Sequence, residues 1–169
     1  MKNHLALRLI LPLAVTVCPG VTIAAAAPGH TSLCHARETT YFSCGTARHK
    51  TISLCGALPA ALQYRYGSAK RVELEFPKLA SDGPGRLRYA HYARFQTDRA
   101  EVSFHHADTD YAVFDYTENG RRSAGVQVTT ANGKELQVRC AGAIRGSLDG
   151  LGQSLQCDTD SALNLGGCR

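Results

Sequence analysis

The densest group of side chains suited to chemistry lies between His105 and Asp110, in the run His-His-Ala-Asp-Thr-Asp. Imidazole and carboxylate groups this close together are ligands for zinc, copper or another divalent cation. Asp and Thr are also ordinary turn residues, and a turn at Ala107–Asp110 would leave only a strand end beside solvent. Both interpretations stay open. The metal hypothesis uses His105, His106, Asp108 and Asp110, with His91 as a further ligand.

Motifs of the common enzyme mechanisms do not occur in the sequence. Ser147 lies between glycines, but without the G-x-S-x-G spacing that presents a nucleophilic serine on a sharp turn. Glu73 and Glu75 stand as neighbours on a polar strand face, as solvated carboxylates do, and no glycine-rich phosphate loop is present. We therefore expect a protein without enzymatic activity and without a cofactor.

A second candidate site is a basic stripe on one predicted strand. Arg86, Arg88, Tyr92 and Arg94 would project together, with Ala90 between them. Arginine and tyrosine are favoured at contact surfaces because both offer large area and directional donors. The stripe would bind a protein or an envelope component. The alternative is a solvated sheet face with cross-strand pairs to Glu73 or Glu75.

Charge is distributed unevenly along the chain. Residues 65–99 contain eight Lys or Arg against four acids, whereas residues 108–118 contain four acids and no base. Such asymmetry can steer an acidic partner toward the basic strands. The net charge of +5 is too small to favour nucleic acid as the partner.

The first 26 residues have the order of a secretory signal peptide. Lys2 and Arg8 precede an apolar run from Leu9 to Ile23 and four alanines, which favours cleavage after Ala26. Cleavage would leave 143 of the 169 residues, with 17 bases against 14 acids and a charge of +3. No apolar run long enough to span a membrane remains. These features predict one domain over residues 27–169 and a periplasmic or secreted location.

Six cysteines would remain after export, and an even number behind a signal peptide predicts three disulfides. Six cysteines permit 15 pairings. Spacing along the chain favours Cys44–Cys55 across a short hairpin and Cys140–Cys157 across a short loop. Cys34–Cys168 would then tie the two ends together.

Alternation of apolar and polar residues predicts strands from about residue 40 to residue 140. In Arg71–Phe76, for example, Val72, Leu74 and Phe76 face one way and the charged residues face the other. In Arg86–Phe95, every second residue from Leu87 to Phe95 would face the core. Asn132-Gly133 stands between two alternating runs and predicts a hairpin with a type I′ turn. We expect about eight strands in an antiparallel meander that closes as a small barrel or sandwich.

The tail, residues 141–169, has a different pattern. Ile144, Leu148, Leu151 and Leu155 recur at helical spacing, and Ser147 is a possible N-cap. Two glycines, Gly150 and Gly152, oppose a stable helix. The prediction is a short helical or irregular tail.

Several stretches resemble a family of small exported β-rich proteins of proteobacteria for which no activity is established. They include Tyr41-Phe-Ser-Cys44, Ile52-Ser-Leu-Cys55, Gln63-Tyr-Arg-Tyr-Gly67, Glu73-Leu-Glu-Phe-Pro77, His91-Tyr-Ala-Arg-Phe-Gln96, Glu101-Val-Ser-Phe104 and Ala124-Gly-Val-Gln-Val128. The resemblance implies a signal peptide and a β-rich domain, and it supplies no catalytic residues.

In size, export and strand rhythm the chain is also similar to the periplasmic inhibitors of C-type lysozyme, which are disulfide-tied antiparallel barrels. The Ser-Gly-containing inhibitory loop of that family has no equivalent here, so this likeness concerns the fold alone. The leading expectation is an exported, non-enzymatic binding or envelope-associated protein, with a lysozyme-type hydrolase inhibitor as its sharper form. The alternative is a metal-binding protein or metal-dependent enzyme that uses the histidine–aspartate run.

Overall fold

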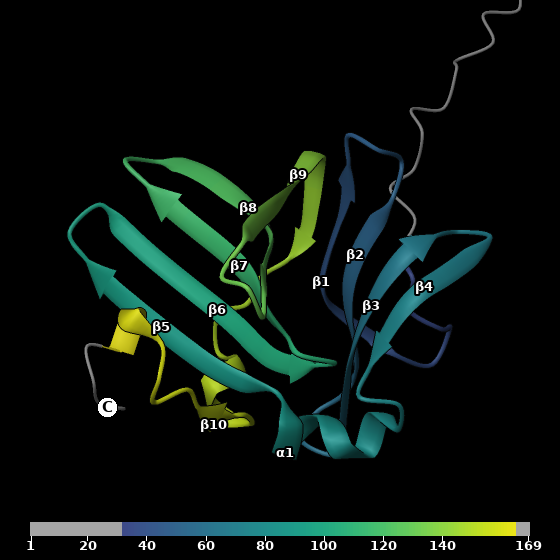
Figure 1. Cartoon of the computed structure of the whole chain (residues 1–169). Coiled ribbons are helices and arrows are strands. Elements are labelled where there is room, and N and C mark those ends of the chain that lie inside the picture. Colours follow the sequence, from purple (N-terminus) through teal and green to yellow (C-terminus); the bar gives the residue numbers. More distant parts are fainter. Residues whose placement is uncertain (1–31, 165–169) are drawn as a thin grey trace, which may run out of the picture.

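The computed structural model describes residues 32–164, so the predicted signal peptide and Cys168 lie outside the described residues. The mainly β fold is confirmed (Figure 1), with ten strands where about eight were expected. The strands are β1 (Thr39–Thr46), β2 (Thr51–Ala57), β3 (Ala61–Ser68), β4 (Arg71–Phe76), β5 (Arg88–Arg94), β6 (Thr97–His106), β7 (Thr109–Glu118), β8 (Arg121–Thr130), β9 (Glu135–Gly146) and β10 (Gln156–Cys157). The helical pieces are short: η1 (Ala80–Asp82), α1 (Gly83–Arg86), η2 (Leu151–Gln153) and η3 (Ala162–Asn164).

All ten strands belong to one sheet, in the order β10-β5-β6-β7-β8-β9-β1-β2-β3-β4. Neighbouring strands run antiparallel, except that β10 runs parallel to β5. The meander is therefore confirmed, and the sheet curls into a half-barrel, in keeping with the natural twist of strands. Figure 1 shows the β1–β4 half on the right and the β5–β8 half on the left, with β9 between them.

Strand β9 joins the two halves because its ends pair with different neighbours. Residues 135–139 pair with β8, and residues 140–146 pair with β1. A disulfide between Cys44 of β1 and Cys140 of β9 lies at the change of partner. The chain thus crosses from one half to the other at a covalently tied point.

The core fills the concave side of the curled sheet. Its largest fully buried side chains include Phe42, Ile52 and Tyr64 from the first half and Val102 and Val113 from the second. The sheet edge at β4 also approaches β6, because Phe76 stacks on Phe104 with 4.5 Å between ring centroids. Phe104 stacks in turn on Tyr111 of β7 at 4.8 Å. This aromatic row covers the open side of the half-barrel.

Two of the hairpin turns have the two positive φ angles of a type I′ turn, and the β8–β9 turn does not. Asn119 and Gly120 between β7 and β8 both have positive φ, as a type I′ turn requires, and so do Ala107 and Asp108 between β6 and β7. The β8–β9 hairpin is confirmed, but its predicted type I′ turn is wrong. Of Asn132 and Gly133, only Gly133 has positive φ, and the loop is closed by a hydrogen bond from Gly133 N to Thr130 O.

A buried polar layer lies on the convex side of β1–β3, under the N-terminal segment 32–38. The guanidinium of Arg65, only 3% exposed, binds both carboxylate oxygens of Glu38 and also contacts Glu75 at 3.1 Å. It donates further hydrogen bonds to Leu33 O and to Gln63 Oε1. All of its donor nitrogens therefore have partners, as a buried charge requires.

The C-terminal tail is irregular with short 3₁₀ turns, as one form of the prediction had it, but its helical spacing has another origin. Ile144 belongs to β9, Leu148 lies in the following loop, and Leu151 begins η2. Asp115, 7% exposed, fixes this loop: its carboxylate accepts two hydrogen bonds from Arg122 at 2.7 Å and one from Leu148 N. Ser147 Oγ accepts a hydrogen bond from Asp149 N, but no α-helix follows.

The predicted disulfide pairing is wrong. Cys34 is bonded to Cys55, and Cys44 is bonded to Cys140, so none of Cys44–Cys55, Cys140–Cys157 and Cys34–Cys168 forms. Cys157 also takes part in a disulfide. Cys44–Cys55 and Cys140–Cys157 were predicted from nearness in sequence, and Cys34–Cys168 was the pair that remained, so the error in the first two extends to the third. Cys44 and Cys55 lie on opposite faces of the sheet, the first in the core and the second beneath the N-terminal segment.

Candidate functional site

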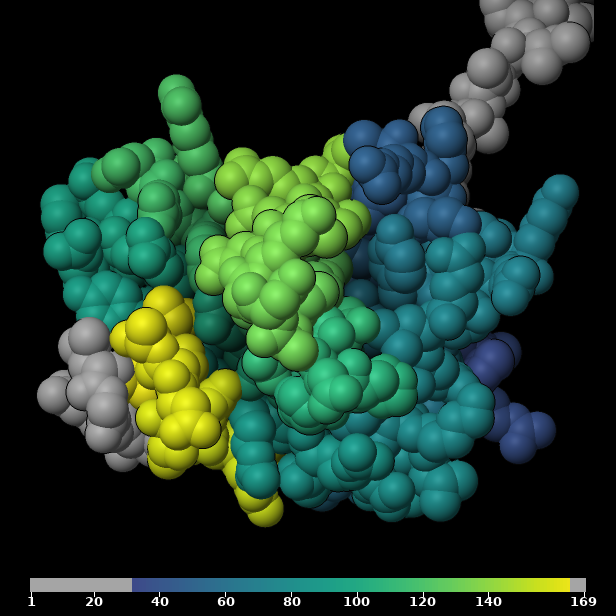
Figure 2. Space-filling view, viewed as in Figure 1, coloured from purple at the N-terminus to yellow at the C-terminus, as the bar shows by residue number. Residues whose placement is uncertain are grey.

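A hollow of about 700 Å³ lies mainly over the face of β6–β8 that is turned away from the core, and at one end it reaches the rings of Phe76, Phe104 and Tyr111. In Figure 2 the C-terminal segment (yellow) and the β8–β9 hairpin (light green) lie on either side of this region. We call it the outer cleft. Its lining side chains come from β5–β8, α1, the end of β4 and the C-terminal segment 158–162.

The floor of the outer cleft is set by strand alternation and register. Glu101, Ser103 and His105 alternate along β6 with the buried Val102 and Phe104, so they point away from the core. In the neighbouring strands, Asp110 lies opposite His105 and Ala112 lies opposite Ser103. Gln127 and Thr129 of β8 extend the same rows. The floor of the outer cleft therefore consists mainly of side chains that can donate or accept hydrogen bonds.

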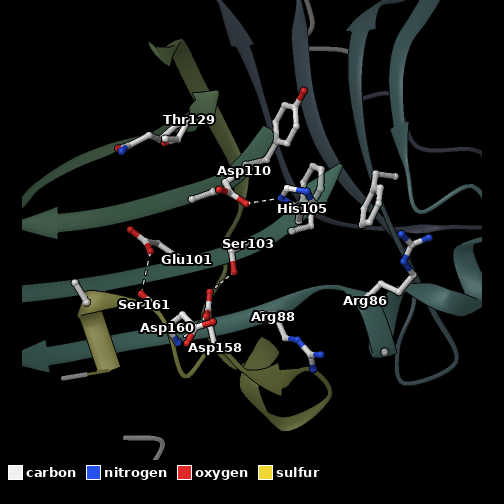
Figure 3. A pocket seen from close by; sticks show the side chains of 17 residues that line it. Arg86, Arg88, Glu101, Ser103, His105, Asp110, Thr129, Asp158, Asp160 and Ser161 are labelled. Atoms are coloured by element: carbon white, nitrogen blue, oxygen red, sulfur yellow. Dashed lines mark hydrogen bonds and ion pairs between the residues drawn. The ribbon is translucent and has the colours of Figure 1, made fainter. Parts of the chain in front are cut away.

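The C-terminal segment forms one wall and is held there by carboxylates. Ser103 Oγ donates a hydrogen bond to Asp158, and Ser161 Oγ donates one to Glu101 at 3.4 Å (Figure 3). Glu101 also accepts a hydrogen bond from Tyr116 OH. Burial, together with this hydrogen bond, raises the pKa of the Tyr116 phenol well above its ordinary value. Glu101 and Asp158 thus already serve to fasten the wall.

The opposite end of the outer cleft is basic. Arg86 ends α1, and its guanidinium lies over the ring of Phe76 with 4.5 Å to the centroid. Arg88 follows at the start of β5 and is half-buried. Among residues 32–164, no carboxylate forms an ion pair with either guanidinium. In Figure 3 both arginines lie apart from the carboxylates of the C-terminal segment.

The predicted basic stripe does not form one continuous surface. Arg86 and Arg88 line the outer cleft, whereas Tyr92 and Arg94 lie farther along β5 and do not. Ala90 between them is only 1% exposed, because the C-terminal segment lies across this part of β5. Arg86 also belongs to α1 and not to the strand. At the far end of the same strand, Phe95 was expected in the core but lies in the β5–β6 turn, 87% exposed.

The predicted histidine–aspartate metal site is split by the β6–β7 turn. His105 Nδ1 lies 2.8 Å from Asp110 Oδ1 on the outer cleft. His106 points to the other face, where its ring packs 5.5 Å from that of Phe76. Asp108 is an exposed turn residue at φ 55°. A turn was the alternative interpretation of this run, and it leaves two of the four side chains together.

Two other groups among the described residues each bring three candidate metal ligands together. In one, Cys34 and Cys55 stand near Glu38, but both sulfurs are consumed by their disulfide. The other consists of His91, Asp98 and Asp149, whose ligand atoms lie within 4.8 Å of one another. Burial and the carboxylates of Asp149 and Asp98 also raise the pKa of neighbouring Tyr89 to about 12.

Sequence reasoning missed the contribution of the C-terminal segment to the outer cleft. Asp158, Asp160 and Ser161 line it, yet nothing in their spacing places them beside β6. The available signal was the polar run from Asp158 to Ser161, which suits a surface segment better than a helix. Ser103 and Glu101 were also detectable in principle, as the polar side of a strand with clean alternation.

Comparison of the chain with known families, with curated proteins and with solved structures finds no match. No helix within the described part of the chain is long and apolar enough to cross a membrane.

Proposed function

We propose that the protein is an exported, non-enzymatic binding protein whose outer cleft accepts an anionic, hydrogen-bonding group of an envelope component or partner protein. The observation that carries the proposal is the pair Arg86 and Arg88, which line a cleft of about 700 Å³ without a carboxylate partner among the described residues. A guanidinium with free donors is suited to bidentate recognition of a carboxylate or phosphate.

Binding is favoured over catalysis by what the acidic groups of the cleft do. Glu101 and Asp158 accept hydrogen bonds that attach the C-terminal segment to β6. Both carboxylates therefore already have a structural role in the protein. The side chains of His105 and Asp110 are 63% and 72% exposed, and no nucleophilic group among residues 32–164 is hydrogen-bonded to the pair.

Export is supported by the cysteines together with the N-terminal sequence. Disulfides persist in oxidising compartments, and here they join residues far apart in the chain. The basic, apolar and small-residue order of residues 1–26 is that of a secretory signal. We place the protein in the periplasm or outside the cell.

The test uses the mature chain, residues 27–169, as bait in an envelope extract, with bound proteins quantified by mass spectrometry. The double variant Arg86→Ser/Arg88→Ser should lose its specific partners at least tenfold. The matched control, Tyr92→Ser/Arg94→Ser, alters the other half of the basic stripe outside the cleft and should retain them. If the cleft variant captures the same partners as the unaltered protein, the outer cleft is not the binding site.

A lysozyme-type inhibitor is the sharper form of this proposal. A hydrolase surface loop with an acidic residue would complement the two arginines. Purified mature protein added to a panel of peptidoglycan hydrolases should then reduce the activity of at least one, and the Arg86→Ser/Arg88→Ser variant should not. Full activity of every hydrolase at saturating protein would remove the inhibitor form.

A further inference from the structure

We infer that His91, Asp98 and Asp149 bind a divalent cation of the zinc type, at a site separate from the outer cleft. Their candidate ligand atoms, one imidazole nitrogen and two carboxylate oxygens, lie within 4.8 Å of one another. A tetrahedral zinc site with bonds of about 2.1 Å places its ligand atoms about 3.4 Å apart. Small side-chain rotations therefore suffice to close the set.

Two of the ligands are positioned by the β5–β6 pair. In the register of these strands His91 lies opposite Ala100 and Ala93 lies opposite Asp98, so the two ligands are diagonal neighbours on one face. His91 Nε2 is already 3.1 Å from Asp98 Oδ1. The imidazole is also supported from behind, where its ring stacks on Tyr89 at 6.2 Å with an interplanar angle of 19°.

The third ligand comes from the loop after β9, and its backbone is fixed by other contacts. Leu148 beside it is fully buried, and Leu148 N donates a hydrogen bond to Asp115. Asp149 N donates one to Ser147 Oγ at 3.0 Å. The side chain of Asp149 makes no hydrogen bond or ion pair with the described residues. Asp149 is therefore held in place while its carboxylate stays available.

The three side chains face a hollow of about 300 Å³, which Tyr89, Gly150, Gly152 and Gln153 also line. Neither Asp98 nor Asp149 has an Arg or Lys within ion-pair distance among residues 32–164. Two carboxylates and one imidazole at this spacing leave negative charge that a cation would neutralise. The open side of the hollow has space for a water as the fourth ligand. The site would thus differ from a closed structural zinc site, in which the protein supplies all four ligands.

The outer cleft supplies a control of nearly the same composition. His105 Nδ1 and Asp110 Oδ1 lie 2.8 Å apart, but no third His, Cys, Asp or Glu among the described residues is close enough to complete a metal site with them. A pair of this kind should bind zinc far more weakly than a set of three. The comparison isolates the role of Asp149.

The experiment is zinc titration of the untagged mature protein by calorimetry, with elemental analysis after dialysis. We expect one Zn²⁺ per chain and a higher Tm on zinc addition, since a ligand of the folded state stabilises it. Asp149→Asn and His91→Ala should each weaken binding at least tenfold, while His105→Ala/Asp110→Asn should leave the affinity unchanged. Tm without zinc confirms that each variant folds.

Three results would overturn the inference: the absence of stoichiometric zinc, equal affinity in the unaltered protein and Asp149→Asn, or loss of binding in His105→Ala/Asp110→Asn alone. The last would locate the metal at the histidine–aspartate pair of the outer cleft. Zinc affinity is measured without any partner protein. A negative result for zinc therefore leaves the proposed binding function of the outer cleft untouched, and the two proposals can fail independently.

Discussion

Arg65 shows how a single residue can depart from its own alternation pattern. It stands between Tyr64 and Tyr66 on β3, where a charged side chain predicts a solvent-facing position. The N-terminal segment covers that position, and Glu38 and Glu75 neutralise the guanidinium there. The sequence of one strand contains no sign of a covering segment that begins about thirty residues away, so the burial of Arg65 was not predictable from it.

The Arg65–Glu38 pair yields a prediction about stability. Glu38→Gln keeps the side chain's shape but leaves the buried guanidinium with Glu75 as its only carboxylate partner. Removing one partner of a buried pair costs roughly 3–5 kcal/mol, and the remaining Glu75 should reduce this to about 2–3 kcal/mol. We expect Tm to fall by about 5–10 °C. The control is Glu73→Gln, whose partner Lys50 is at the surface, and its Tm should stay close to that of the unaltered protein.

The same pair predicts a pH dependence. Hydrogen bonds from Arg65 lower the pKa of Glu38 from its ordinary 4.5. A carboxyl group whose pKa is lower in the folded state than in the unfolded state stabilises the fold. Its full contribution is present at pH values above the unfolded-state pKa, and it is lost as the pH falls through the folded-state pKa. Urea unfolding at pH 6, 4.5 and 3 should therefore show the difference between the unaltered protein and Glu38→Gln shrinking below about pH 4.5. A constant difference over this range would contradict the assignment.

At the scale of elements, strands were predictable and tail segments were not. The bounds of β4 coincide with the predicted Arg71–Phe76, because a strand with one buried face repeats with period two. The tail prediction failed because its four apolar residues belong to different elements: Ile144 to β9, Leu148 to a loop, Leu151 to η2, and the buried Leu155 to the link between η2 and β10. Their spacing resembles that of a helix only when these separate elements are treated as a single one.

The short helix α1 depends on direct contact between backbones. A Cβ built on Gly83 would lie 1.8 Å from Leu62 O of β3, whereas one on Gly85 in the same helix would have nothing within 4 Å. This contact fixes where α1, and with it Arg86 at its end, meets the sheet. No pattern in the sequence distinguishes the two glycines, since both flank Pro84.

Gly83→Ala should therefore destabilise the protein by about 2–3 kcal/mol, as overpacking against a backbone does. Gly85→Ala should be neutral or stabilising by up to about 1 kcal/mol, because alanine favours the helix. Denaturant unfolding of the two variants makes the comparison. Since Gly83→Ala also displaces Arg86, its partner capture should fall with its stability, and equal stability of the two variants would show that α1 does not rest on β3 as described.

At the scale of the whole molecule, the order of the strands in the sheet decides which cysteines meet between β1 and β9 and which residues line the outer cleft. It brings β9 against β1, so Cys140 meets Cys44 across a sequence separation of 96, whereas Cys34 and Cys55 are 21 apart. Predictions based on nearness in sequence could not find the longer bridge. The outer cleft depends on the same geometry, because its lining spans α1, the five strands from β4 to β8 and the tail.

The two described bridges should accordingly differ in what they contribute. In the chain-entropy model a loop of 96 residues corresponds to about 4.7 kcal/mol and one of 21 residues to about 3.3 kcal/mol. We expect Cys44→Ala/Cys140→Ala to lower the free energy of unfolding by about 1.4 kcal/mol more than Cys34→Ala/Cys55→Ala. Denaturant unfolding of both double variants tests the order.

The same two double variants also test whether the β1–β4 half and the β5–β8 half unfold together. If the β1–β4 half and the β5–β8 half unfold as one unit, the Cys44–Cys140 bridge restrains the whole chain and its loss costs the larger amount, with a single transition retained. If the halves unfold separately, its removal should instead split the transition into two, since neither of the two described disulfides then joins the halves. Peptide mapping without reduction provides the independent check, because a Cys44–Cys55 or Cys140–Cys157 peptide would contradict the curled sheet itself.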